Sequence, residues 1–77
     1  MKYIYGVVRE TYIGKDKSRT TYGIAVMTET EEGVEFPVRA MHDCSSDLQA
    51  VTEFVALCNR LQLSPVHLDD AVDDFLF

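Results

Sequence analysis

The spacing of apolar residues changes once along the chain, close to Met41, and this change limits the folds that the sequence can adopt. Before Met41, apolar and polar residues alternate, most clearly over residues 34–41. After it, apolar residues recur every three or four positions. Alternation is typical of a strand with one buried face, and the longer spacing is typical of an amphipathic helix. The sequence therefore predicts strands first and helices second, the order of an α+β domain.

Three segments rich in β-branched and aromatic residues, which favour strands, lie at 3–13, 20–29 and 34–41. A polar segment at 14–19 joins the first two as a hairpin loop, and Gly33 can supply the positive φ that tight turns often need. Pro37 cannot donate a hydrogen bond to a neighbouring strand, so its segment should lie at an edge of the sheet. We therefore predict a three-stranded antiparallel meander with residues 20–29 in the centre.

The second part of the chain predicts two helices. Ser45 or Ser46 is a suitable N-cap, and Ser46 with Gln49 matches a capping box. The first helix should end near residues 61–63. Ser64 and Pro65 then begin another helix, because proline fits the first turn. Helical spacing relates the apolar residues that should face the sheet: Leu48, Val51, Phe54, Val55, Leu57, Cys58 and Leu61 in the first helix, and Leu68, Ala71, Val72 and Phe75 in the second.

Two helices can cover one face of a sheet of this size, so we predict a βββαα fold with both helices packed on one sheet face. The side chains expected in its core are Tyr22, Ile24, Val26, Val34, Phe36 and Val38. The first strand is apolar on both faces, with Tyr3, Tyr5 and Val7 on one and Ile4, Val8 and Tyr12 on the other. Whichever face is uncovered should join Met27 and Met41 in an exposed patch. Such a patch either marks a homodimer or partner site or reflects only the tolerance of these residue types for partial exposure.

The net charge of −6 comes entirely from the second half of the chain. Residues 1–41 carry six positive and six negative side chains, whereas residues 42–77 carry one positive and seven negative ones. An acidic field repels phosphate backbones and anionic lipids, so neither nucleic acid nor a membrane is an expected partner. The chain shows no export signal, no apolar run long enough to span a bilayer, and only two cysteines. We predict a single cytoplasmic domain over residues 1–77.

The residues best suited to chemistry are His42, Asp43, Cys44, Cys58 and His67. A zinc site needs about four ligands, usually in two closely spaced pairs, and only His42 and Cys44 form such a pair. Cys44 precedes a predicted helix N-terminus, which would favour its thiolate, but no oxyanion-hole motif accompanies it. We therefore predict no catalytic residue, metal site or cofactor.

A cluster of acidic residues near one histidine marks the second predicted helix, as His67, Asp69, Asp70, Asp73 and Asp74. Aspartate is a poor helix former, so the cluster needs a reason. Selection for solubility, recognition of a basic partner surface and binding of a divalent metal each account for it. We treat these five residues as a candidate partner surface, and Tyr12, Met27 and Met41 as a candidate contact on the sheet.

The segment 57–76 resembles the C-terminal signature of a small uncharacterised protein family of clostridia and related Firmicutes. The matching pieces are Leu57-Cys58-Asn59, Pro65-x-His67-Leu68, and Asp70 followed by Asp74-Phe75-Leu76, with a looser match at Tyr22-Gly23-Ile24. The resemblance implies a cytosolic bacterial protein and supplies no functional residues. From the residues themselves we predict a non-enzymatic protein-interaction or regulatory module, homodimeric or bound to another protein. The alternative is a small-molecule or metal-binding protein that uses His42, Cys44 and His67.

Overall fold

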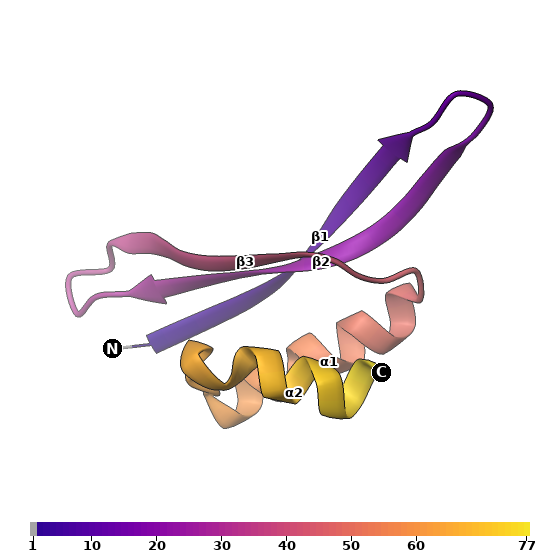
Figure 1. Cartoon of the computed structure of the whole chain (residues 1–77). Helices are drawn as coiled ribbons and strands as arrows, with labels where there is room; N and C mark the ends of the chain where they lie inside the picture. Colours follow the sequence, from indigo (N-terminus) through magenta and orange to yellow (C-terminus); the bar gives the residue numbers. More distant parts are fainter. Residues whose placement is uncertain (1) are drawn as a thin grey trace.

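A computed structural model describes residues 2–77 as one antiparallel sheet followed by two helices (Figure 1). The elements are β1 (Lys2–Ile13), β2 (Ser18–Glu29), β3 (Glu35–Ser45), α1 (Leu48–Leu61), a single 3₁₀ turn η1 (Pro65–His67) and α2 (Leu68–Leu76). The strand order is β1-β2-β3, with β2 in the centre and β3, which contains Pro37, at an edge. The predicted βββαα fold is therefore confirmed.

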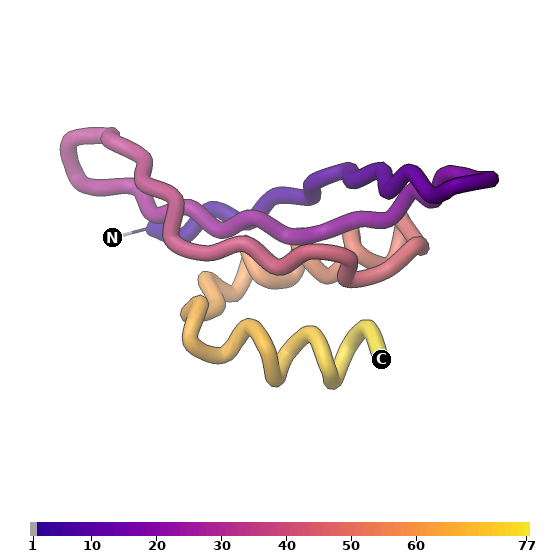
Figure 2. The backbone as a smooth tube through the Cα atoms, turned by 45° about the horizontal axis from the view of Figure 1, so that its top comes forward, coloured from indigo at the N-terminus to yellow at the C-terminus, as the bar shows by residue number. Residues whose placement is uncertain are grey.

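Both helices lie on the same face of the sheet, and they run antiparallel to each other (Figures 1 and 2). The sheet is much longer than the helical layer, because its hairpins extend past the helices at both ends (Figure 1). The molecule accordingly measures 48 × 25 × 19 Å. A large part of the sheet consequently has no helix on either side of it.

The core lies between the covered face of the sheet and the two helices. Its buried residues are Tyr5, Ile24, Val26, Cys44, Val51, Phe54, Val55, Cys58, Leu68 and Val72. The predicted core positions Ile24 and Val26 are buried as expected, and Tyr22 packs against the cluster while partly exposed. Tyr3, Tyr5 and Val7 are the covered side of β1, so its other side is the open one.

The prediction that Val34, Phe36 and Val38 belong to the core is wrong, since each is about half exposed. Val26 pairs with Arg39 but Met27 pairs with Pro37, which leaves Val38 as an extra residue in β3. One extra residue exchanges the two faces of a strand, because side chains alternate with a period of two, and this removes Val38 from the core. Phe36 pairs with Thr28, next to Tyr3, so it lies on the helix side of the sheet and is nevertheless half exposed. Val34 lies before β3 begins.

Arg39 and Met41 consequently face the helices in the covered part of β3, opposite Val26 and Ile24. A second irregularity between the pairs Tyr22–Ser45 and Ile24–Met41 lengthens β3 by comparison with β2. Cys44, next to this irregularity, is the buried residue that β3 contributes to the core. The third strand thus runs four residues past the predicted end at Met41.

The start of α1 also differs from prediction. Asp47 is the N-cap, and its carboxylate accepts a hydrogen bond from the Ala50 N–H at 3.1 Å. Because Asp47 takes the N-cap position, the predicted capping box of Ser46 and Gln49 does not form, and Ser45 is still part of β3. The helix ends at Leu61 as predicted, with Gln62 in the left-handed region at φ 52° and a hydrogen bond from the Leu63 N–H to the Cys58 carbonyl. These are the features of a Schellman termination.

Candidate interaction surfaces

The open face of the sheet can be assigned from the strand register. Tyr5 is buried beneath the helices, so its neighbours Ile4 and Gly6 point to the other side. Side chains paired across neighbouring strands share a face, which gives three adjacent rows on the open side: Ile4, Met27 and Pro37; Gly6, Ala25 and Ala40; and Val8 with Gly23. We call these eight residues the open-face rows.

The predicted sheet contact residues divide between the two faces. Met27 belongs to the open-face rows, and Tyr12 lies further along β1 on the same side. Met41 does not lie there, because it pairs with Ile24 and packs against the core. The open-face rows carry no charged residue, and charged side chains begin on either side of them with the pairs Lys2–Glu29 and Glu10–Thr21.

A network of polar side chains lies at one end of the open face, and no pattern in the sequence indicated it. The Glu10 carboxylate bonds to the His42 ring through one oxygen and accepts the Asp43 N–H at 2.8 Å through the other. Arg19 holds Asp43 with two bonds of 3.0 and 3.2 Å. The Thr21 hydroxyl lies within hydrogen-bond distance of an Asp43 carboxylate oxygen, at 2.7 Å, and of the Ser45 carbonyl, at 3.0 Å.

These contacts explain both the shape of the strand and the acidity of its carboxyl groups. Asp43 adopts a positive φ of 52°, a conformation that aspartate tolerates better than most residues. The Asp43 N–H, followed by the His42 ring, lowers the pKa of Glu10, and bonds from Arg19 and Thr21 lower the pKa of Asp43. Among residues 2–77 no buried side-chain nitrogen or oxygen lacks a partner. The network therefore has a structural explanation, which is to hold the irregular end of β3.

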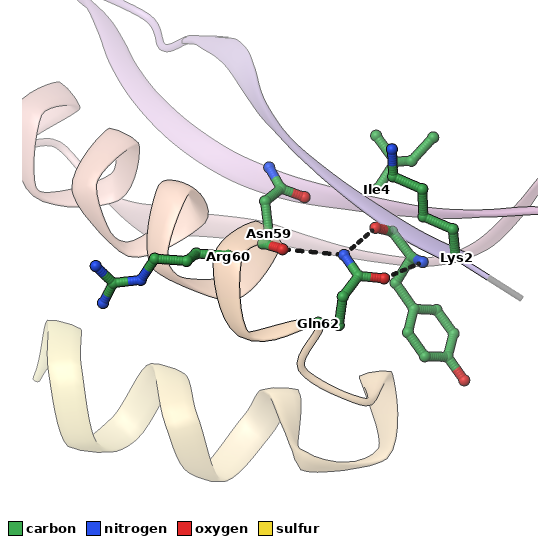
Figure 3. A pocket seen from close by; sticks show the side chains of 6 residues that line it. Lys2, Ile4, Asn59, Arg60 and Gln62 are labelled. Atoms are coloured by element: carbon green, nitrogen blue, oxygen red, sulfur yellow. Dashed lines mark hydrogen bonds between the residues drawn. The ribbon is translucent and has the colours of Figure 1, made fainter.

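A second feature hidden in the sequence is the way α1 covers the outer edge of β1. The Asn59 side chain accepts the Tyr5 N–H at 2.7 Å and donates to the Tyr5 carbonyl at 2.9 Å. Gln62 does the same for Tyr3, with both bonds at 2.9 Å (Figure 3). Each amide pairs with the strand much as a neighbouring strand would. An exposed strand edge is a template for pairing with other chains, so these two amides protect the beginning of β1.

The predicted acidic partner surface lies on α2 and just before it. Its five residues, His67, Asp69, Asp70, Asp73 and Asp74, are all exposed. Asp69 is already engaged, because Arg39 from β3 donates to its carboxylate and also to the Pro65 carbonyl at 3.2 Å. This ion pair fastens the start of the second helical segment to the sheet.

An apolar groove runs between α1 and α2. Its lining residues are Ala50, Glu53, Phe54, Leu57, Cys58, Leu61, Leu63, Ala71 and Phe75. The Phe54 and Phe75 rings, one from each helix, pack at 5.8 Å between their centres. Leu61 and Phe75 each remain more than 60 % exposed. The most enclosed part holds about 70 Å³, far less than the roughly 300 Å³ that a small-molecule site usually needs.

The residues considered for metal binding or nucleophilic chemistry are not assembled. Across residues 2–77, no three histidine, cysteine or acidic side chains converge as a metal ion would require. Cys44 and Cys58 are both buried and free. Burial, followed by the nearby Glu10 charge, raises the pKa of the Cys44 thiol, so the expectation of a favoured thiolate there is wrong. Burial also raises the pKa of Cys58.

Comparison with known proteins adds a family without adding a function. A family model described as a family of unknown function (DUF6514) matches residues 1–77. Neither the curated proteins nor the solved structures contain a match. Within residues 2–77, none of the helices has the length and apolar character needed to cross a membrane.

Proposed function

Because the chain belongs to DUF6514, a family of unknown function, we propose its role from its surfaces alone. The proposed role is that of a non-enzymatic protein-interaction module, which forms a homodimer through the open face of its sheet. The observation that carries this proposal is the uncharged character of the open-face rows. In a chain of which 26 % of residues are charged, eight adjacent positions on the uncovered sheet face carry no charge, and only Gly23 among them is buried, with the Glu10 carboxylate against it. Exposed apolar patches of this kind commonly mark association sites.

The distribution of charge favours a second copy as the occupant. Residues 1–41, which supply β1, β2 and most of the open face, have no net charge, whereas residues 42–77 carry the whole net charge of −6. A dimer joined through the open faces would keep the acidic α2 helices on its two outer sides. Like charges would then be separated by both sheets, and salt would screen what repulsion remains.

The shape of the face also suits a second sheet. Gly6, Ala25 and Ala40 form the central row, so no large side chain stands in the middle of the open face. Sheets in sandwiches pack about 10 Å apart. Twelve-residue strands about 4.8 Å apart give a whole face on the order of 550 Å² in plan, of which the uncharged rows from Ile4 to Val8 cover roughly 240 Å². This is less than the roughly 800 Å² per partner of a standard interface, so a weak dimer is expected.

The test is the molar mass in solution, measured by sedimentation or light scattering from 10 to 500 µM. The mass should rise from 8.7 kDa towards twice that value. Ala40→Glu should hold the protein at the monomer mass, because it buries a charge in the middle of the interface. Thr52→Glu, an equivalent change at an exposed position of α1, is the matched control and should leave the dimer intact. A monomer throughout this range, or a dimer indifferent to Ala40→Glu, would rule the proposal out.

The alternative prediction was a small-molecule or metal-binding protein. The residues predicted for it do not act together, because His42 bonds to Glu10 while Cys44 is buried in the core. We therefore do not propose it as a second function.

A further inference from the structure

The groove between α1 and α2 lies on the opposite side of the molecule from the open-face rows and has a different character. We infer that it is a docking site for a cationic amphipathic helix of another protein. This inference extends the proposed interaction role to the helical side and names the chemistry of the partner. It does not require that the sheet face forms a dimer.

The apolar residues of α1 have the spacing that such a partner needs. Phe54, Leu57 and Leu61 follow at steps of three and four residues along the groove wall. Ala71 and Phe75, also four residues apart, form the opposite wall. At a rise of 1.5 Å per residue, the stretch from Phe54 to Leu61 is about 10 Å long. A helix lying in this groove would insert two or three apolar side chains at matching intervals, as in other helix-in-groove complexes.

The groove is shaped to take side chains and not a free small molecule. Its most enclosed part, about 70 Å³, is lined only by apolar side chains and Cys58. It widens towards Ala50 and Glu53, where a further 210 Å³ is open to solvent. One leucine or isoleucine side chain would fill the enclosed part. Its exposed walls, Leu61 and Phe75, would then be covered.

The charged residues around the groove determine which sign of charge the partner helix should carry. Glu53 belongs to the α1 wall, and Asp70 and Asp74 stand next to Ala71 and Phe75 on α2, all of them exposed. Arg60 is the only positive residue after residue 41, and it lies with Glu53 and Leu57 on α1, so the α1 rim carries one charge of each sign. A helix with lysine or arginine beside its apolar stripe would therefore meet its opposite charges along the α2 rim. A second copy of this helical layer would bring acidic rims together, which makes it the wrong occupant.

This arrangement refines the acidic surface predicted from the sequence. Arg39 donates a hydrogen bond to Asp69, so we assign Asp69 a structural role and leave it out of the docking surface. Asp70 and Asp74 are separated by one helical turn, so they lie along one side of α2. The partner-binding residues are accordingly these two aspartates together with the apolar walls, and His67 is not required.

The experiment uses a synthetic 18-residue helix with leucines at helical spacing and lysines on both flanks of that stripe. Fluorescence anisotropy should detect binding to the full chain, and raising the salt from 0.05 to 0.5 M should weaken it several-fold. A peptide of the same pattern with glutamates in place of lysines should not bind. A peptide with the lysines kept but the leucines scattered should bind at least about tenfold more weakly, because its apolar stripe is lost.

Variants assign the binding to the groove. Leu61→Gln should raise the dissociation constant about tenfold, whereas Leu48→Gln should leave it unchanged. Leu48 is a matched control, since it is also an exposed leucine of α1 but does not line the groove. Asp70→Asn with Asp74→Asn should remove most of the salt dependence, and Glu31→Gln with Glu32→Gln in the β2–β3 turn should not. The Ala40→Glu variant should bind the peptide normally, which separates this site from the sheet dimer.

Three results would overturn the inference. These are the absence of binding at 200 µM, equal binding of the cationic and anionic peptides, and equal effects of the Leu61 and Leu48 substitutions. A rise in molar mass that is lost in Leu61→Gln but retained in Ala40→Glu would show instead that the groove holds a second copy.

Discussion

Replacing Asn59 by alanine should destabilise the protein by about 1.4 kcal/mol. Its amide makes two hydrogen bonds with the Tyr5 backbone, at 2.7 and 2.9 Å, across a sequence separation of 54 residues. At a net value of about 1 kcal/mol each, their loss costs about 2 kcal/mol. Alanine is a better helix former than asparagine, which offsets about 0.6 kcal/mol of this loss of stability. For a domain of this size, the difference corresponds to a fall of roughly 6–11 °C in melting temperature.

The assay is urea unfolding followed by circular dichroism, combined with amide hydrogen exchange. In the parent protein the Tyr5 N–H should exchange slowly, and in Asn59→Ala its exchange should become much faster than that of β2 amides. Arg60→Ala, the next residue on the exposed side of α1, is the control and should change the free energy of unfolding by less than about 0.5 kcal/mol. If Asn59→Ala is as stable as this control, or leaves the Tyr5 amide protected, the amide pairing does not stabilise the edge of β1.

Three further predictions concern titrating groups. The pKa values of Glu10 and Asp43 are lowered, so their stabilising effect is complete above the ordinary Glu value of 4.5 and is lost as the pH falls through the lower values of the folded state. Glu10→Gln should make the free energy of unfolding fall less steeply between pH 6 and 2.5 in urea titrations. An unchanged slope would contradict this. Burial raises the pKa of Tyr5 from 10.0 to about 12, so the contribution of Tyr5 to stability should be complete below pH 10 and be lost as the pH rises towards 12. Tyr5→Phe should reduce the loss of stability between pH 8 and pH 11, and an unchanged loss would contradict this. Cys44 and Cys58 are buried and their pKa values are raised, so a disulfide reagent at pH 8 should modify them only at the rate of unfolding. Rapid modification without denaturant would contradict their buried positions.

Much of the architecture could be predicted because it depends on local patterns. Residues 20–29 alternate over a full strand, Pro37 cannot occupy a central strand, and the spacing after residue 46 fits helices. These properties act over a few residues and do not depend on the rest of the chain. The candidate surfaces were predicted less completely. The acidic residues of α2 could be found by composition, but their division between Asp69, paired with Arg39, and Asp70 and Asp74, beside the groove, could not.

The polar network and the edge amides could not have been predicted from a single sequence. Glu10 and His42 are separated by 32 positions, and Gln62 and Tyr3 by 59. Nothing in the local pattern of either pair indicates its partner. Asn59 and Gln62 read as ordinary polar residues at the end of a helix. Their role depends on where the edge of β1 lies relative to that helix, which is a property of the packed structure.

Local patterns in the amino-acid sequence were enough to predict the kinds of elements, their order, the position of the edge strand and the concentration of negative charge in the helical half. Which side of β3 faces the helices depends on the packed structure. In a strand, one additional residue exchanges the two faces, and Val38 is that residue here. It places Arg39 and Met41 on the helix side in place of Val38 and Ala40, and Arg39 can then reach Asp69. Where an extra residue is accommodated depends on the pairing with β2, and that pairing forms only when distant parts of the chain meet.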